Sequence, residues 1–381
     1  MVFSVCDIDL LWLLSWCGNI QPTALRGSFQ DTTVRNMIDI GLVRQHKNSG
    51  SLALTKKGHQ CLTVSNVPCP DYCALSYRGD LLQRRLRIAN ITITAYRAQL
   101  NLFAAELSEL AQGYSLFLPH ISRGRERNIW GSSRISAVFR LGNCCYSTYN
   151  VYPGIGRLNL EDEEKILSSC VSRSRSSNRA FFFAGDSYPS ILTELERKDK
   201  ENEGRLISYR EMWERSSSPI HLLSCDYTGA VQLQIMAQPD YRTRLARGAL
   251  KEEYQPPPLN VSVWDAIYQD RPLVIAADMD LRRLDAAIQA AHSRGLEQIA
   301  VAALEKQAKT VLIPRYQDTG QARVFALTKE AITEVTGRPP APYTPPHTQF
   351  LTEKGDVVDA PPIRIPGKAG GQAGGKARPL V

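Results

Sequence analysis

The sequence predicts a mixed α/β protein with a disordered tail, and three observations lead to this fold class. Residues 1–64 combine short helical patterns with a hairpin, and residues 65–115 contain apolar residues at heptad-like spacing. Strand-like runs alternate with helical patterns over residues 116–338, which favours an α/β domain. Residues 339–381 are rich first in Pro and then in Gly, Ala and Lys, a composition that cannot bury enough apolar surface to fold.

Two helices are expected first along the chain. Apolar residues at helical spacing predict an amphipathic helix that ends at Gly18: Ile8, Leu11 and Trp12. Pro22 is tolerated at the first position of a helix, so a second, shorter helix can begin there and stop at Gly27.

The stretch from Asp31 to Gly58 carries the strongest functional signal in the sequence. Asp31 is a suitable N-cap, and a helix is expected from Thr32 to Ile40. Its apolar face would consist of Val34, Met37 and Ile38. The opposite face would carry polar residues that can reach base edges and phosphates: Thr32, Thr33, Arg35, Asn36 and Asp39.

A hairpin is expected directly after this helix. The extended run Leu42-Val43 turns at residues 48–51 and returns as Leu52-Ala53-Leu54. The order of helix, short helix, reading helix and hairpin resembles a winged helix-turn-helix domain. The matching features are Gly41-Leu42-Val43 after the reading helix and the segment L-T-K-K-G, Leu54 to Gly58, which closes the wing.

The winged helix-turn-helix resemblance implies binding to double-stranded DNA. Four residues of the reading helix are expected to read the major groove: Thr32, Thr33, Arg35 and Asn36. Four basic residues around the hairpin are expected to hold phosphates: Arg44, Lys47, Lys56 and Lys57. The net charge of +8 fits a nucleic-acid partner, although such small domains also serve as protein-interaction modules.

We expect a cytoplasmic location. No run of about 18 apolar residues appears, so no membrane span is expected. The N-terminus lacks an early Lys or Arg, and Asp7 and Asp9 interrupt its apolar run, which argues against a signal peptide. The nine cysteines form no regular framework and fit reduced thiols. No cofactor is expected from the sequence.

A group of potential zinc ligands follows the hairpin: His59, Cys61, Cys69 and Cys73. Residues 69–73 give an acceptable spacing for one ligand pair. However, the spacing from His59 to Cys61 is unusual, and Cys is also a small buried apolar residue. The burial of these thiols without metal is therefore the stronger interpretation.

A long helix is predicted from Leu82 to Leu110. Apolar residues step along it by threes and fours over roughly four heptads, and a second line of smaller residues lies nearly opposite. A helix that is apolar on two sides is sandwiched, either within one monomer or between the copies of a homodimer. A dimer would present two reading helices to a repeated DNA site.

Basic residues concentrate around this helix. Between Arg78 and Arg140 there are ten Arg against four acidic residues. The segment from Ile121 to Arg134 has the composition of a loop that grips phosphates, with Trp130 available to stack on a base. A solvated surface loop explains the same composition.

The region after this loop is expected to form an α/β domain. Strands are predicted at residues 135–140, 144–151, 180–184, 219–224, 231–236 and 271–276, and the pair at 219–224 and 231–236 is expected to form a hairpin. Helices are predicted at residues 160–170, through 191–195 and at 281–293. The segment 322–336 is predicted as strand, turn and helix rather than as a second winged helix.

Catalytic motifs are weak in this sequence. A metal-dependent nuclease of the restriction type needs an acid on one strand and acid-x-Lys on the next, because the carboxylates must hold a divalent metal. Glu163-Glu164-Lys165 and Pro239-Asp240 supply these residue types, but in the wrong order and with the former on a predicted helix. No P-loop, no Gly-x-Ser-x-Gly and no His-Glu-x-x-His occurs.

The winged helix, the basic helix and an α/β region without a catalytic signature together resemble the replication-relaxation family, whose members are encoded by bacterial plasmids and integrative conjugative elements. The resemblance is firmest over residues 7–64 and architectural from there to about 240. It implies DNA binding in the replication, transfer or regulation of a mobile element. It also implies an α/β domain that resembles a degenerate restriction-nuclease-like fold. A metal-dependent nuclease and a non-enzymatic scaffold of a DNA-transfer complex are the alternative functions.

Overall fold

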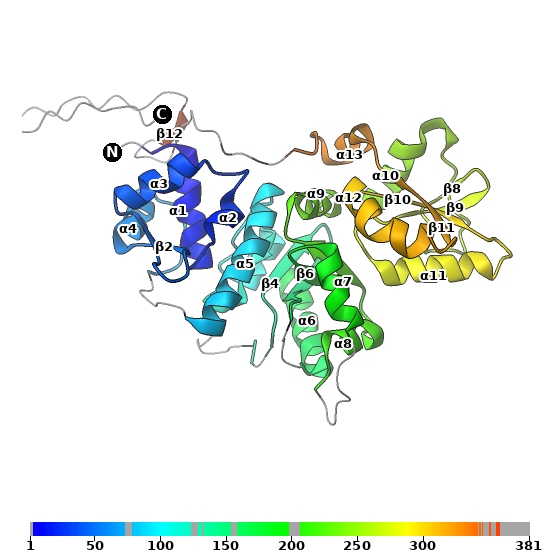
Figure 1. The fold of residues 1–381 in the computed structure, drawn as a ribbon, viewed down its shortest axis with the longest axis horizontal. Helices are drawn as coiled ribbons and strands as arrows, with labels where there is room; N and C mark the ends of the chain where they lie inside the picture. Colours follow the sequence, from blue (N-terminus) through cyan, green and yellow to red (C-terminus); the bar gives the residue numbers. More distant parts are fainter. Residues whose placement is uncertain are drawn as a thin grey trace, which may run out of the picture.

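The structure is a computed structural model that describes residues 3–72, 78–122, 129–131, 133–153, 158–197, 206–341, 343, 345, 350–351 and 356–358. The predicted mixed α/β class is confirmed. Figure 1 shows an elongated molecule in which a helical N-terminal part, a central sheet and a second sheet follow one another along the long axis. Within the described segments, no helix combines the length and the apolar character that a membrane span requires.

The N-terminal part contains four helices and a two-stranded wing. The helices are α1 (Val5–Cys17), α2 (Pro22–Leu25), α3 (Asp31–Asp39) and α4 (Lys56–Val64), and the wing is formed by β1 (Val43–Gln45) and β2 (Leu52–Leu54). A reciprocal cap begins α1, because the Ser4 hydroxyl accepts from the Asp7 amide and the Asp7 carboxylate accepts from the Ser4 amide. Ile20 adds a bridge to Leu52 of the wing. The predicted order of these helices and the wing is therefore present.

Helix α5 (Gly79–Arg97) is shorter than predicted. The expected helix from Leu82 to Leu110 is wrong beyond residue 97, because Gln99 and Phe103 both adopt positive φ angles and turn the chain. Residues 107–112 form a separate 3₁₀ helix, η1 (Leu107–Gln112). The apolar spacing of the sequence extends beyond residue 97, and no Gly or Pro at that point indicates that the helix ends there.

Both apolar lines of α5 are buried within the chain. One side packs on α1 and α2, and another packs on the central sheet and on α9 (Tyr227–Met236). Tyr96 donates a 2.6 Å hydrogen bond to Asp9 of α1. Arg97 donates to the carbonyl oxygens of Ala24 and Arg26. Packing within one monomer therefore accounts for both apolar faces of α5. A homodimer through this helix stays a prediction, and the burial of α5 gives no support for it.

The central sheet has five strands in the order β3-β4-β5-β6-β7, with bounds Leu116–Phe117, Ala137–Leu141, Cys144–Asn150, Asn178–Gly185 and Ile220–Ser224. Strands β3, β4 and β5 are antiparallel neighbours, whereas β5, β6 and β7 run parallel. Two short 3₁₀ helices lie outside the sheet, η2 (Pro119–Ile121) and η3 (Lys251–Glu253).

Helices cover both faces of the central sheet. Along β6, Phe181 and Phe183 pack on the side of α6 (Leu160–Ser174) and α7 (Tyr188–Glu196), which lies beside α8 (Tyr209–Arg215). Phe182, between them, packs on the side of α5 and the N-terminal helices. Because β6 is buried on both faces, its sequence reads as a continuous apolar run.

The second sheet has four strands in the order β11-β10-β9-β8, with bounds Ala322–Ala326, Ile299–Ala303, Arg271–Ile275 and Ala266–Tyr268. Strands β8 and β9 form an antiparallel hairpin, and β9, β10 and β11 are parallel. Helix α11 (Leu281–His292) connects β9 to β10. Helix α12 (Glu305–Gln307) and the wide π-type helix η4 (Ala308–Gln317) connect β10 to β11.

The two sheets repeat one order of elements. Each has an antiparallel hairpin, a helix, a parallel strand, a helical connection, a second parallel strand and a final helix, from β4 to α9 and from β8 to α13 (Lys329–Thr336). The helix that precedes each hairpin packs on the final helix: α5 on α9, and α10 (Tyr241–Leu250) on α13. Helix α9 also joins the two units, because Leu233 faces the core with α5 while Ile235 faces the core of the second sheet.

The predicted hairpin at residues 219–236 is wrong in its second half. Residues 220–224 form β7, but residues 227–236 form α9, which begins where the Asp226 side chain accepts from the Gly229 amide. All but the first residue of α9 are buried, so its alternating Val-Gln-Leu-Gln pattern shows no single apolar face. Buried Gln232 finds its partners in the Leu222 and Asp278 carbonyls.

A buried ionic group lies between the two sheets. The Asp278 carboxylate accepts hydrogen bonds from Tyr241 at 2.6 Å and from Arg242 Nε at 2.8 Å. Burial by itself would raise the pKa of Asp278, but Arg242, His221 and Arg283 outweigh it and hold that pKa below its ordinary range.

The segment after α13 returns to the N-terminal part, where Tyr343 packs edge-on against Tyr96 with their ring centroids 5.1 Å apart. In the region predicted as a disordered tail, residues Phe350–Leu351 (β12) pair with Val357–Val358 (β13), so that prediction is wrong for these short strands. Residues 359–381 lie outside the described residues.

Candidate nucleic-acid interface

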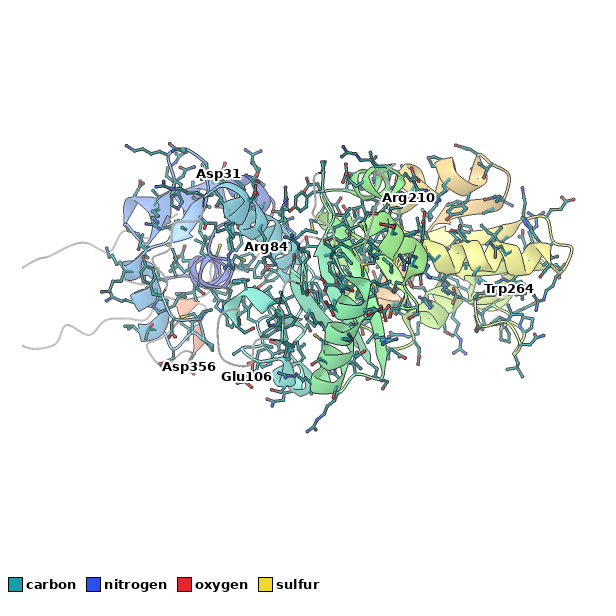
Figure 2. The ribbon with its side chains drawn as sticks, turned by 90° about the horizontal axis from the view of Figure 1, so that it is seen from below. Asp31, Arg84, Glu106, Arg210, Trp264 and Asp356 are labelled. Carbon is teal, nitrogen blue, oxygen red and sulfur yellow. The ribbon has the colours of Figure 1, made fainter. Side chains whose placement is uncertain are left out.

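Helix α3 presents part of the predicted polar face to solvent. Thr32 and Arg35 are exposed and Asn36 is half-buried, whereas Met37 is fully buried against the N-terminal core. The helix begins at Asp31 itself, and the capping position is taken by Gln30, whose side chain makes no cap hydrogen bond. In Figure 2, Asp31 marks the start of α3, far along the molecule from Trp264 of the second unit.

Thr33 does not lie on the exposed face, which corrects its predicted placement. It is 8% exposed. Residues 33 and 37 are one turn apart, so Thr33 shares the face of Met37 and packs toward α1. Burial raises the pKa of the Cys6 thiol in α1 to about 12, and a hydrogen bond with Thr33 opposes part of that effect. A Thr is small enough to be buried, which the simple division into polar and apolar faces overlooked.

The wing is a short hairpin whose loop is anchored to the rest of the domain. Val43 pairs with Leu54, and Gln45 pairs with Leu52. The His46 amide donates to the Ser51 carbonyl, and the Gln21 side chain donates to the Ser49 carbonyl. The wing carries two exposed cations of the predicted set, Arg44 on β1 and Lys47 in the anchored loop.

The segment Leu54 to Gly58 begins helix α4 as well as closing the wing. Thr55 caps α4 by accepting from the Gly58 amide at 3.1 Å, and its hydroxyl lies 2.8 Å from the Gly41 carbonyl and 3.0 Å from that of Leu42. A Cβ on Gly58 would stand 2.3 Å from the Leu42 carbonyl oxygen. Only Gly allows this approach, so the residues of this motif fix the end of α3 against the start of α4.

The two lysines that follow Thr55 differ in their surroundings. Lys57 donates a 2.8 Å hydrogen bond to the carbonyl of Ile40, so its charge is held at the end of α3. Lys56 is exposed. Within the described part of the chain, no ion pair involves Arg35, Arg44, Lys47 or Lys56, and their charges face solvent. Free cations of this kind are the groups that contact phosphates.

One further cation beside the wing was not predicted as a site residue. Arg78 precedes α5 and, with Lys47 and other residues of the wing loop, lines a hollow of about 470 Å³. The sequence signal was the position of Arg78 directly before Gly79 at the start of a long helix. Its proximity to the wing depends on the packing of α5 and could not be read from spacing.

The potential zinc ligands are only partly brought together. The His59 ring nitrogen Nε2 lies 2.8 Å from the Pro70 carbonyl oxygen and 3.6 Å from the Cys69 sulfur. Cys73 lies outside the described residues. Among those that are described, no group of three His, Cys, Asp or Glu side chains is arranged to hold a metal ion. Burial is the first cause that raises the pKa values of Cys61 and Cys69.

The acidic residues considered for catalysis lie on different elements, and Glu163 makes structural hydrogen bonds. Glu163 lies on α6 and is 2% exposed, and its carboxylate accepts from Ser133, Tyr149 and the Arg134 amide. Lys165 pairs with Asp162 on the surface of the same helix. Asp240 precedes α10 in the second unit with a left-handed backbone.

Trp130, expected as a stacking residue, is buried. It stacks on Phe117 with ring centroids 5.7 Å apart and donates to the Ser122 hydroxyl. Residues 123–128 and 132 of the basic loop lie outside the described residues.

Comparisons with protein-family models, with curated proteins and with solved structures find no match.

Proposed function

We propose that the chain binds double-stranded DNA and, from its resemblance to the replication-relaxation family, that it acts in the replication, transfer or regulation of a bacterial mobile element. The observation that carries the proposal is the exposure of Thr32 and Arg35 on α3 together with the unpaired cations of the wing, whose strand β1 contacts α3. A helix with short polar side chains fits the major groove, and a cationic rim neutralises the flanking phosphates. Thr33 is left out of the reading set because it is buried.

The division of labour follows from chemistry and position. Arg35 can donate two parallel hydrogen bonds to guanine, and half-buried Asn36 matches adenine. Arg44 and Lys47 of the wing and Lys56 at the start of α4 follow the reading helix in the chain and supply charge without base selectivity. Lys57 has its ammonium group on the Ile40 carbonyl, so its contribution is to orient the end of α3.

The test is a DNA selection followed by affinity measurements on the full chain. Bound fragments are selected from random DNA, and the affinity for the preferred site is measured over a series of salt concentrations. Arg35→Ala should cost roughly 1–3 kcal/mol on the preferred site and relax its sequence preference. Lys56→Ala should weaken all sequences alike and reduce the salt slope by about 1.

Lys309→Ala is the matched control, because Lys309 is an exposed cation of the second unit that pairs with Glu305. Its DNA affinity should equal that of the unchanged chain. Binding that is undetectable, or that does not depend on salt, would refute the proposal. Unchanged affinity in both Arg35→Ala and Lys56→Ala would favour a protein-interaction scaffold instead.

The finer description of the α/β part also remains our proposal. An antiparallel meander, a crossover helix and parallel strands covered on both faces support a fold of the restriction-nuclease type. Glu163 is buried and accepts three hydrogen bonds from protein groups, which supports a structural role for this carboxylate rather than metal binding. Magnesium-dependent cleavage of a supercoiled plasmid by the purified protein would instead establish the enzymatic alternative.

A further inference from the structure

A cleft of about 490 Å³ lies where the N-terminal part meets the carboxyl ends of β6 and β7. It is separate from the exposed face of α3 and from the wing. In open α/β sheets, ligands bind outside the carboxyl ends of parallel strands, and cavities of about 300–1,000 Å³ suit small organic molecules. The cleft therefore has the position and the size of a ligand site.

One wall of the cleft is polar and cationic. Helix α5 is buried on most sides but keeps a polar stripe along the cleft: Gln83, Arg87, Asn90 and Arg97. Arg26, exposed after α2, lines the same wall. Arg97 is committed to backbone carbonyls, and the Arg87 guanidinium lies over the Tyr152 ring. Stacking on a ring leaves the N–H groups at the edge of a guanidinium free to donate, so Arg26, Arg87 and the amides of Gln83 and Asn90 are available to a ligand.

The opposite wall carries carboxylates and an aromatic ring. Asp186 follows β6 and is exposed, while Asp226 follows β7 and pairs with Lys306 at 2.6 Å. Tyr227 is 38% exposed beside Asp226. Asp186 takes part in none of the ion pairs formed within the described segments. Its carboxylate is a free acceptor that lines the same cleft as Arg26 and Arg87.

These two walls suit a ligand with an anionic group at one end and hydroxyl donors at the other. Guanidinium groups prefer phosphate, whereas a carboxylate accepts from hydroxyl groups and is the group that holds a ribose diol in nucleotide sites. At the start of α9 the Asp226 carboxylate accepts from the Gly229 amide, and its negative charge opposes phosphate binding there. The phosphate is therefore expected at the arginine side chains of the other wall. Tyr227 offers a surface on which a base can stack.

We propose that this cleft binds a ribonucleoside phosphate, with the phosphate at Arg26 and Arg87, the ribose hydroxyls at Asp186 and the base beside Tyr227. Asp186 determines the preference for ribose. The site needs no P-loop, because its phosphate contacts come from arginine side chains on α5 and after α2. This inference does not depend on DNA binding by α3.

Isothermal titration of the full chain tests the proposal. The probes are the four ribonucleoside 5′-monophosphates, their 2′-deoxy forms and inorganic pyrophosphate. At least one ribonucleotide should bind with a Kd below about 1 mM. The Kd values of the matching deoxynucleotide and of pyrophosphate should be at least about tenfold higher. Asp186→Ala should remove the preference for ribose over deoxyribose. Arg26→Ala should weaken ribo- and deoxyribonucleotides alike and keep the preference.

Asp318→Ala, at an exposed carboxylate after η4, is the matched control and should bind as the unchanged chain does. The proposal is overturned if none of the nucleotides binds at about millimolar concentration. It is also overturned if Asp186→Ala retains the full preference for ribose, or if pyrophosphate binds as tightly as the nucleotides, since the cleft would then be a simple anion site. DNA affinity measured in parallel separates such a failure from a failure of the α3 interface.

Discussion

Replacing Gly58 by Ala places two physical effects in direct opposition. Gly58 lies inside the first turns of α4, where Ala is favoured over Gly by about 1 kcal/mol because it loses less backbone entropy. However, the added Cβ would stand 2.3 Å from the Leu42 carbonyl oxygen and 2.7 Å from a Leu54 methyl group. The carbonyl is also fixed by the Thr55 amide at 3.0 Å, so it cannot move aside as a flexible side chain would.

The close contact should outweigh the helix propensity. Overpacking costs about 1–3 kcal/mol, and the approach to a fixed backbone oxygen places this contact at the upper end. After the gain of about 1 kcal/mol in helix propensity, Gly58→Ala should lower the free energy of unfolding by roughly 1–2 kcal/mol. Because Leu42 follows α3, the displaced contact should also tilt the reading helix and weaken DNA binding. Denaturant titration measures the first effect, and a binding titration measures the second.

Thr63→Ala is the matched control in the same helix. Thr63 is exposed and its hydroxyl donates to the His59 carbonyl of its own helix, so its replacement should be neutral or stabilising by a few tenths of a kcal/mol. A Gly58→Ala chain that is as stable as the unchanged protein, or more stable, would show that α4 does not approach Leu42 as closely as described.

Two further predictions concern carboxylates that are removed from solvent. Asp278→Asn should destabilise the protein by roughly 1–3 kcal/mol, because half-buried Arg242 loses the charged partner that fully buried Asp278 provides. A loss below about 1 kcal/mol in denaturant titration would contradict this. Burial raises the pKa of Asp9 from 3.8 to about 6, and the hydrogen bond from Tyr96 opposes only part of this. Folding therefore favours protonated Asp9, and that stability is lost as the pH rises from about 4 through about 6. At pH 7 the free energy of unfolding of Asp9→Asn should be roughly 1–3 kcal/mol higher than that of the unchanged chain, and near pH 4 the two should be equal. Equal stability at both pH values would disprove the effect.

The sequence predicted best where one local rule decides the structure. The helix at 160–170 has acidic residues in its first turn, and the structure has α6 there. The hairpin of β4 and β5 follows from two apolar runs around Leu141-Gly142-Asn143. At the candidate interface, the exposure of Arg35, Arg44 and Lys56 was read from helical spacing and from the position of the wing.

Prediction failed where tertiary packing overrides the local pattern. Helix α5 ends at residue 97 because the chain must turn back toward the sheet, and positive φ at Gln99 and Phe103 has no marker in the sequence. Helix α9 was read as a strand because burial on all sides removes the amphipathic signal. The cleft at β6 and β7 was missed because its residues come from α2, α5 and two strand ends that only the fold brings together.

The placement of α9 between the two sheets has a consequence for how the chain loses its structure. A fragment that ended near residue 240 would leave Val231 and Ile235 without the core of the second sheet, and a fragment that began there would lack those same side chains. The two repeated units are therefore not expected to unfold independently of each other. Calorimetry should record one shared transition for them, and a protease that opens either unit should quickly release the other.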